Sequence, residues 1–230
     1  MPGLLLIDKP AGWTSFDVVN YVRKIVAAAE GRKPKSVKVG HTGTLDPFAT
    51  GLLVLLVGKE YTRRAGEFSK LDKTYEVTMR LGSSSTTGDP EGEIAKVSEV
   101  EPDIEQIKKA AKKFVGVIQQ TPPAYSAIKI NGQRAYKLAR AGQKVVLEPR
   151  QVTINKLEIV GYNYPDVQFI ADVSSGTYIR SLVEDMGEHL GTAGYTAELR
   201  RTRVGKFSAN EAVKPELLSQ DQNIDNILIK

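Results

Sequence analysis

The most hydrophobic stretch of the chain is the run from Leu52 to Val57, which is apolar at every position and is followed by Gly58. An unbroken apolar run of this length predicts a strand that is buried on both faces. The residues before it, 40–51, are rich in glycine, proline and small polar residues, which predicts a loop. The carboxylate of Asp46 is therefore expected at the mouth of a core strand, either as a structural cap of the loop or as a functional group.

The remainder of the N-terminal half also carries periodic patterns. Residues 4–7 predict a short strand. Thr14 and Asp17 resemble a capping box, and the apolar stripe behind them predicts a helix that ends before Gly31. Strict alternation over residues 75–81 predicts a strand with one buried face.

The middle of the chain mixes loops with short elements. A long Ser/Thr/Gly/Asp loop is predicted over residues 82–93, and a helix is predicted from Asp103 to Val115 with Gly116 as its stop. Residues 125–130 look like a strand that ends in the type I′ hairpin signal Asn131-Gly132. A short basic helix is expected over residues 135–141.

Further strands are predicted over residues 152–160, 167–173 and 196–207, with a helix after Tyr178 and a last helical turn over residues 215–218. The tail from Ser219 is polar, and its apolar residues look too sparse to form much core.

Composition is that of a globular protein, with 41% hydrophobic and 26% charged residues. The absence of cysteine excludes a disulfide framework, a thiolate zinc site and a cysteine nucleophile. With no signal-peptide pattern at Met1 and no apolar run long enough to span a bilayer, we expect a cytoplasmic protein without a membrane partner. The net charge of +5 favours a polyanionic partner.

Several kinds of chemistry are disfavoured by the motifs. The sequence has no P-loop, no GxGxxG after a strand and no HExxH. His41 and His189 are the only histidines, and two without an acidic or thiol cluster make a poor metal site.

The basic residues of the segment 119–150 are interleaved with Tyr125 and Tyr136. Phosphates could take the charge and bases could stack on the rings, so the pattern suits a nucleic acid; an ordinary surface hairpin with solvated lysines fits it equally. Arg180 lies near the start of a predicted helix, where the helix dipole disfavours a cation unless a carboxylate is its partner.

Seven segments, in order, resemble the pseudouridine synthases of the TruB type. The central one is GHTGTLDPFATGLL at residues 40–53; the others are LLLIDKPAGWTSFDVV (4–19), DKTYEV (72–77), TGDPEG (87–92), TPPAYSAIKINGQRAY (121–136), SSGTYIRSL (174–182) and LRRTRVGKF (199–207). The resemblance covers residues 3 to 215 and fits the bacterial stand-alone enzymes, which modify uridine 55 in the tRNA T-loop, better than the guide-RNA-dependent ones.

The resemblance implies the following catalytic roles. Asp46 matches the catalytic aspartate, which attacks the target uridine at the sugar or at the base. Arg180 matches the arginine that pairs with this aspartate and stabilises its charged form. Tyr75 matches the tyrosine that stacks on the flipped base and assists removal of the C5 proton.

The resemblance also implies contacts to RNA. His41 matches the histidine that fills the space left by the flipped base, and Leu199 matches an apolar wall of the pocket. Tyr178 would line the site or be a core aromatic. Asp89 matches a loop position near the RNA, and Lys9 and Pro10 match a KP motif that supports the catalytic loop, although a charged turn would also explain it. The remaining RNA-binding residues expected are Lys129, Arg134 and Tyr136, within the thumb-like insertion 119–150 that closes over the T-loop.

The fold class expected is α/β (α+β), a mixed, largely antiparallel pseudouridine-synthase sheet with flanking helices. The catalytic domain is expected over residues 1–215, and residues 216–230 form a short tail where relatives continue into a C-terminal RNA-binding domain. We therefore expect weaker tRNA affinity than in longer relatives. The reaction needs no cofactor, no metal and no obligatory protein partner, and a monomer is expected. The alternative function is a tRNA folding chaperone that uses the same clamp, although a pure binder has no need for Asp46, Tyr75 and Arg180 together.

Overall fold

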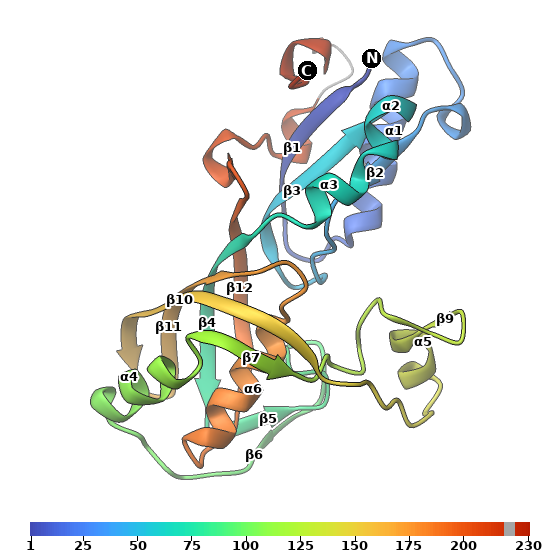
Figure 1. The fold of residues 1–230 in the computed structure, drawn as a ribbon. Coiled ribbons are helices and arrows are strands. Elements are labelled where there is room, and N and C mark those ends of the chain that lie inside the picture. The colour runs from blue at the N-terminus through green and yellow to red at the C-terminus, as the bar shows by residue number, and fades with distance from the viewer. Residues whose placement is uncertain (219–223) are drawn as a thin grey trace. The chain divides into compact units, whose positions relative to one another are not determined.

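The computed structural model describes residues 1–218 and 224–230, so part of the predicted tail lies outside the described residues. The chain divides into two compact units, which we call unit 1 (residues 1–76 and 199–230) and unit 2 (residues 77–198) (Figure 1). Two strands, β4 (Lys73–Leu81) and β12 (Gly194–Val204), continue from one unit into the other. Antiparallel pairing joins β1 (Gly3–Lys9) to β3 (Thr50–Val57), and joins β10 (Arg150–Asn163) to both β11 (Asp166–Val173) and β7 (Gly116–Gln120). β12 pairs parallel with β3, and helices flank these strands, as predicted for a mixed, largely antiparallel α/β fold.

The centre of unit 1 is β3 (Thr50–Val57). It pairs antiparallel with β1 (Gly3–Lys9) and β2 (Val39–His41), and its first residues pair parallel with β12. Every residue from 51 to 57 is buried, which confirms the prediction of a strand covered on both faces.

Helix α1 (Ser15–Ala29) covers one face of β3. Thr14 caps the helix and forms the predicted capping box with Asp17. The stripe that includes Val18, Val22 and Val26 packs in one cluster with Leu53 and Leu55 of β3. Each such side chain contributes about 1.5–3 kcal/mol when fully buried.

The other face of β3 carries Leu52, Val54 and Leu56. These residues pack with Val204 and Phe207, and with aromatic side chains of α2 (Gly58–Arg63) and α3 (Ala65–Ser69). The short strand β13 (Phe207–Ser208) and the 3-10 turns at Pro34–Ser36, Ala209–Glu211, Pro215–Leu217 and Ile224–Ile227 complete unit 1.

The prediction that the tail contributes little core is wrong. Ile224 and Leu228 are buried in the same cluster as α1 and β1. The backbone of Ile229 also exchanges two hydrogen bonds with Leu4, at 2.8 and 2.9 Å. The tail adds to the sheet edge because β1 offers it unpaired backbone groups, a pairing that spans almost the whole sequence.

The strands of unit 2 follow the order β4, β11 (Asp166–Val173), β10 (Arg150–Asn163), β7 (Gly116–Gln120). Helix α4 (Ile104–Lys113) packs on β10 and against α6 (Ile179–His189). The helix begins where predicted, with Asp103 as its cap, but Gly116, with φ of +109°, begins β7 and is not the helix stop.

Two loop predictions need correction. The segment 82–93 is not all loop, because β5 (Ser83–Ser85) pairs with β6 (Ile94–Lys96). Three consecutive serines concealed this strand, since serine has little intrinsic preference for a strand.

The predicted strand over residues 125–130 shrinks to β8 (Lys129–Ile130), which pairs with β9 (Gln133–Arg134). The carbonyls of Ser126 and Ile128 instead accept hydrogen bonds from the first N–H groups of α5 (Ala135–Arg140). Asn131 and Gly132 both have positive φ, at 49° and 85°, which is the geometry of the predicted type I′ hairpin.

Candidate active-site loop

Asp46 lies in the loop that joins β2 to β3, which we call the Asp46 loop (residues 42–49). At its start, the Thr42 N–H donates to the Val54 carbonyl at 3.2 Å. At its end, the Ala49 N–H donates to the Asp46 carbonyl at 3.1 Å. The loop is therefore tied to β3 at its start and closed by a turn of its own at its end.

Ser15 holds the residue before Asp46. As the first residue of α1 it is buried, and its hydroxyl donates to the Leu45 carbonyl at 3.0 Å while accepting from the Leu45 N–H at 2.8 Å. One hydroxyl thus satisfies both backbone groups of Leu45, which restricts the peptide planes on either side of it.

Lys9 holds the residue after Asp46. Its side chain is fully buried, and its ammonium donates to the carbonyls of Pro10 at 2.8 Å, Trp13 at 2.6 Å and Pro47 at 3.1 Å. The Pro47 carbonyl also accepts from the Gly12 N–H at 2.8 Å. The KP motif therefore contacts the Asp46 loop, in line with the supporting role that the resemblance implies.

Arg201 of β12 approaches the same loop. The buried guanidinium donates to the carbonyls of Gly43 at 3.0 Å, Thr44 at 3.5 Å and Leu52 at 2.8 Å. Gly51 allows this strand to come close: its φ is +99°, and a Cβ on it would lie 2.3 Å from the Arg201 carbonyl oxygen.

Lys73 is a further buried cation in this region. Its ammonium donates to the carbonyls of Ser69 and Leu71. Burial, reinforced by the charge of Arg201, lowers the pKa of Lys73 to about 8. Lys9, Lys73 and Arg201 thus place positive charge in the part of unit 1 that holds the Asp46 loop, an environment that favours an anionic group.

The other predicted site residues of unit 1 lie on strands. His41 is the last residue of β2 and is half-buried. Tyr75 of β4 and Leu199 of β12 are both buried, with 8% of each exposed. Asp46, His41, Tyr75 and Leu199 therefore belong to one compact unit.

Arg180 belongs to unit 2, where it lies at the second position of α6. Its guanidinium is 3.2 Å from the Asp89 carboxylate, and both side chains are 4% exposed. The guanidinium also donates to the carbonyls of Thr87 and Tyr125, at 2.7 Å each. Asp89 supplies a carboxylate of the kind required to offset the unfavourable position of Arg180 in the helix dipole.

Asp89 is itself held in place. Its carboxylate accepts from the Thr87 hydroxyl at 2.6 Å and from the Glu91 N–H at 3.0 Å. Arg180 also binds the Tyr125 carbonyl, which lies in the segment 119–150. This network therefore joins α6, the TGD segment and the start of the thumb-like insertion.

Tyr178 precedes α6 and is half-buried. The Gln120 side chain holds its backbone, accepting from the Tyr178 N–H at 2.8 Å and donating to its carbonyl at 3.0 Å. The Arg150 guanidinium lies 4.8 Å from the centre of the Tyr178 ring, a cation–π contact.

The insertion residues present exposed charge. Lys129 and Arg134 are exposed, and Arg134 donates to the Ala127 carbonyl at 2.8 Å. Tyr136 is half-buried, with the Arg140 guanidinium 5.7 Å from its ring centre.

The sequence interpretation missed the roles of Ser15 and Arg201. Arg201 had a signal, because alternation along β12 places it in phase with Leu199, on a buried side where an arginine requires several acceptors. Ser15 looked like an ordinary first residue of a helix, and nothing in the sequence indicates its bond to Leu45.

Among residues 1–218 and 224–230, no three His, Asp or Glu side chains gather as a set of metal ligands. In the same part of the chain, no helix has the length and apolar character needed to cross a membrane.

The chain matches two sequence families over nearly its whole length. Residues 31–179 match the N-terminal domain of the TruB family pseudouridylate synthases, and residues 180–227 match the tRNA pseudouridylate synthase B C-terminal domain. The tRNA pseudouridine synthase B of Aquifex aeolicus is 42% identical over 231 residues, covering 100% of this chain and 77% of that protein. The protein of the same name from Thermobifida fusca is 43% identical, covering 95% of this chain and 75% of its own length.

Solved structures agree with these relatives. The chain aligns with a protein of a Cbf5-Nop10-Gar1 complex with a TM-score of 0.70 and 29% identity, covering 92% of this chain and 52% of that one. It therefore spans about half the length of that protein. The fold and the anchored aspartate loop define a pseudouridine synthase, and the chain belongs to the TruB family of these enzymes.

Proposed function

We propose that this enzyme converts a uridine in the T-loop of tRNA, at position 55, to pseudouridine. One observation carries the proposal. Asp46, which matches the catalytic aspartate of the family signature, lies in a loop whose neighbouring residues are fixed by Ser15, Lys9 and Arg201. A reacting group held by packed and hydrogen-bonded supports is what positional catalysis requires. The relatives named above carry tRNA in their names, which supports the choice of substrate.

The reaction proposed is an isomerisation. Asp46 attacks the flipped uridine, either at the sugar carbon C1′ or at the base. The bond from N1 to C1′ breaks, the uracil turns, and C5 bonds to C1′ as Asp46 is released. The proton on C5 is lost and N1 gains one, so atoms and charge balance without a redox step.

The other residues have supporting roles in this proposal. Arg180 keeps Asp46 ionised, and Tyr75 stacks on the base and assists removal of the C5 proton. His41 fills the space that the flipped base vacates, and Leu199 and Tyr178 line the pocket. Extrusion of the base costs a few kcal/mol, less in a loop than in a duplex.

The remaining contacts proposed are to RNA outside the pocket. Asp89, within the TGD segment, pairs with Arg180, which also donates to the Tyr125 carbonyl of the insertion. Lys129, Arg134 and Tyr136 of the insertion would clamp the T-loop, since they present charge and an aromatic ring.

Tritium release from C5-labelled uridine in a tRNA transcript tests the proposal. Wild type should release the label from position 55, and Asp46→Asn should not. Asp103→Asn is the matched control, because Asp103 caps α4 and asparagine caps a helix equally well. Release by Asp46→Asn at the wild-type rate would exclude Asp46 as the nucleophile. Absence of release by wild type, together with accelerated tRNA folding, would favour the folding chaperone.

A further inference from the structure

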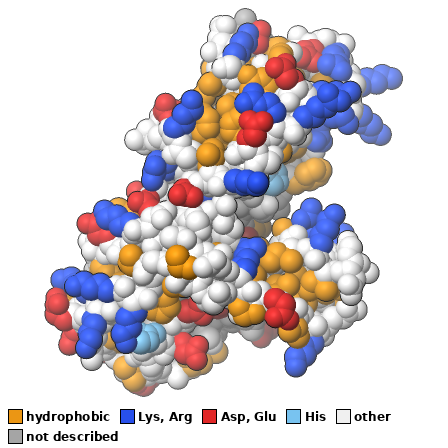
Figure 2. Space-filling model, in the orientation of Figure 1, with side chains coloured by type: hydrophobic (Ala, Val, Ile, Leu, Met, Phe, Trp, Pro, Cys, Tyr) orange, Lys and Arg blue, Asp and Glu red, His pale blue; other side chains and the backbone are white. Residues whose placement is uncertain are grey.

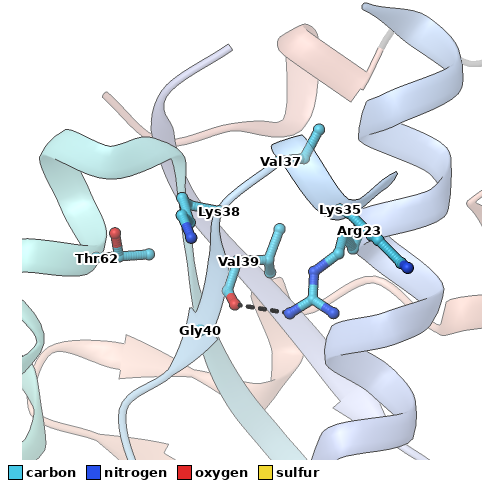
Figure 3. Close-up of a pocket in the computed structure, with 7 residues that line it drawn as sticks. All are labelled: Arg23, Lys35, Val37, Lys38, Val39, Gly40 and Thr62. Carbon is cyan, nitrogen blue, oxygen red and sulfur yellow. Dashed lines mark hydrogen bonds between the residues drawn. The ribbon is translucent and has the colours of Figure 1, made fainter. Parts of the chain in front are cut away.

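A basic cavity lies within unit 1, beside β2. Its volume is about 400 Å³, and it is lined by Arg23, Lys35, Val37, Lys38, Val39, Gly40 and Thr62 (Figure 3). Thr62 from α2 and Arg23 from α1 lie on either side of β2 in this view. The volume falls in the range of ligand sites and far exceeds that of one water molecule.

The charge of the cavity has one sign. Three of the seven lining residues are cationic and none is acidic. Lys35 and Lys38 are exposed, whereas Arg23 is half-buried and fixed by hydrogen bonds to the Asn20 side chain at 2.6 Å and the Val39 carbonyl at 3.4 Å. Figure 2 shows further Lys and Arg side chains over the region where α1, α2 and the 30–38 segment lie in Figure 1. A fixed guanidinium beside two mobile ammonium groups suits a phosphate group.

Gly40 forms part of the cavity wall without a conformational reason to be glycine. Its φ is not in the left-handed region, and a Cβ would have only one neighbour within 4 Å, the Thr62 methyl carbon at 3.8 Å. A glycine in a strand weakens the strand, so neither backbone nor packing accounts for it. Close approach of a bound group to the backbone would account for a glycine at this position.

The cavity is next to the Asp46 loop in the chain. Gly40 directly precedes His41, which begins the connection to that loop. RNA bound at His41 would therefore lie one residue from the cavity wall. We propose that the cavity binds a backbone phosphate of the tRNA T arm, with Arg23, Lys35 and Lys38 as its cationic contacts and Gly40 as its floor. This inference rests on the proposed function, which supplies the T arm as the substrate.

The salt dependence of binding tests the proposal. Each neutralised phosphate adds about 0.7–0.9 to the slope of log Kd against log salt concentration. For an isolated T-arm stem-loop, the double variant Lys35→Gln/Lys38→Gln should lower this slope by about 1 and weaken binding about 5-fold at moderate salt. The control is Lys109→Gln/Lys112→Gln, on exposed positions of α4, which removes the same net charge. It should change the salt slope and the affinity less than Lys35→Gln/Lys38→Gln does.

A second variant adds a methyl group to the cavity wall without changing the charge. Gly40→Ala should weaken stem-loop binding several-fold while thermal unfolding stays near that of wild type, because a Cβ there has space. Gly66→Ala is its control, since a Cβ at Gly66 meets nothing within 4 Å and lies outside the cavity.

Two outcomes overturn the inference: equal slopes for the two lysine pairs, or unchanged affinity for Gly40→Ala. Tritium release by the wild type in the same preparations separates this result from failure of the proposed function. If wild type releases the label and binds the stem-loop but the cavity variants bind as tightly, the function stands and the phosphate site does not.

Discussion

Arg180 and Asp89 form an ion pair at 3.2 Å in which both side chains are 4% exposed. Arg180 is the arginine expected to stabilise the catalytic aspartate, and within its own unit its charge is paired with the carboxylate of Asp89. Asp89 thereby fixes the place of Arg180 at the start of α6 and connects it to the TGD segment through Thr87.

Asp89→Asn should be strongly destabilising. The amide keeps an acceptor for Thr87 and Glu91 but removes the charge opposite a buried guanidinium, and breaking a buried pair from one side costs about 3–5 kcal/mol. The same substitution at Asp166, whose pair with Arg80 is partly exposed, should cost about 1 kcal/mol or less. Urea unfolding measures both, and equal losses for the two variants would contradict the assignment of Asp89 as a buried anchor.

Lys9→Met should reduce turnover more than it reduces tRNA affinity. Without its ammonium, the carbonyls of Trp13 and Pro47 lose a charged donor and the residue after Asp46 loses a support. A displacement of about 1 Å at a reacting group can lower the rate on the order of 100-fold. Single-turnover tritium release and the Kd for tRNA separate the two effects. Lys156→Met, at an exposed position of β10, is the control; a variant at Lys9 with normal turnover would show that the loop needs no such support.

Arg201→Lys tests whether the shape of the guanidinium matters as well as its charge. The side chain reaches the carbonyls of Leu52, Gly43 and Thr44 with three different nitrogens, which one ammonium cannot reproduce. We expect a loss of about 2 kcal/mol in unfolding free energy and slower single-turnover release. Arg203→Lys, at an exposed position two residues along the same strand, should change either property little. Wild-type behaviour of Arg201→Lys would mean that charge alone suffices.

The parts of the fold that could be predicted are those in which local and long-range signals agree. The run 52–57 is apolar at every position, which indicates a strand buried on both faces, and α1 has both its capping box and its apolar stripe in sequence. The core contribution of the C-terminal turn is not visible in its own sequence, because its partners in the core belong to β1 and α1 at the other end of the chain. β5 was missed because a partner strand, not its serines, makes it a strand.

The candidate site divides in a similar way. The loop that carries Asp46 could be identified because glycine, proline and a carboxylate before an apolar run form an unusual pattern. The residues that support this loop could not be identified. Ser15 and Arg201 bind backbone carbonyls, and because every residue has a carbonyl, the sequence does not show which ones they bind. The position of Arg180 near a helix start indicates that it requires a carboxylate partner, but the sequence does not identify that partner as Asp89.

Lys73 should make stability depend on pH in a defined window. Its pKa of about 8 in the folded protein lies below the ordinary value of 10.5, because burial and the charge of Arg201 disfavour the ammonium. Between these values the unfolded chain binds more protons, so the contribution of Lys73 to stability rises with pH. From pH 7 to pH 10 this rise should be about 2 kcal/mol.

The variant Lys73→Met tests this, because it has no titrating group at position 73. The difference in unfolding free energy, variant minus wild type, should therefore fall by about 2 kcal/mol from pH 7 to pH 10. Lys109→Met, which removes an exposed lysine, corrects for the general loss of charge. A difference between Lys73→Met and wild type that stays constant from pH 7 to pH 10 would show that Lys73 is not the group that titrates in this window.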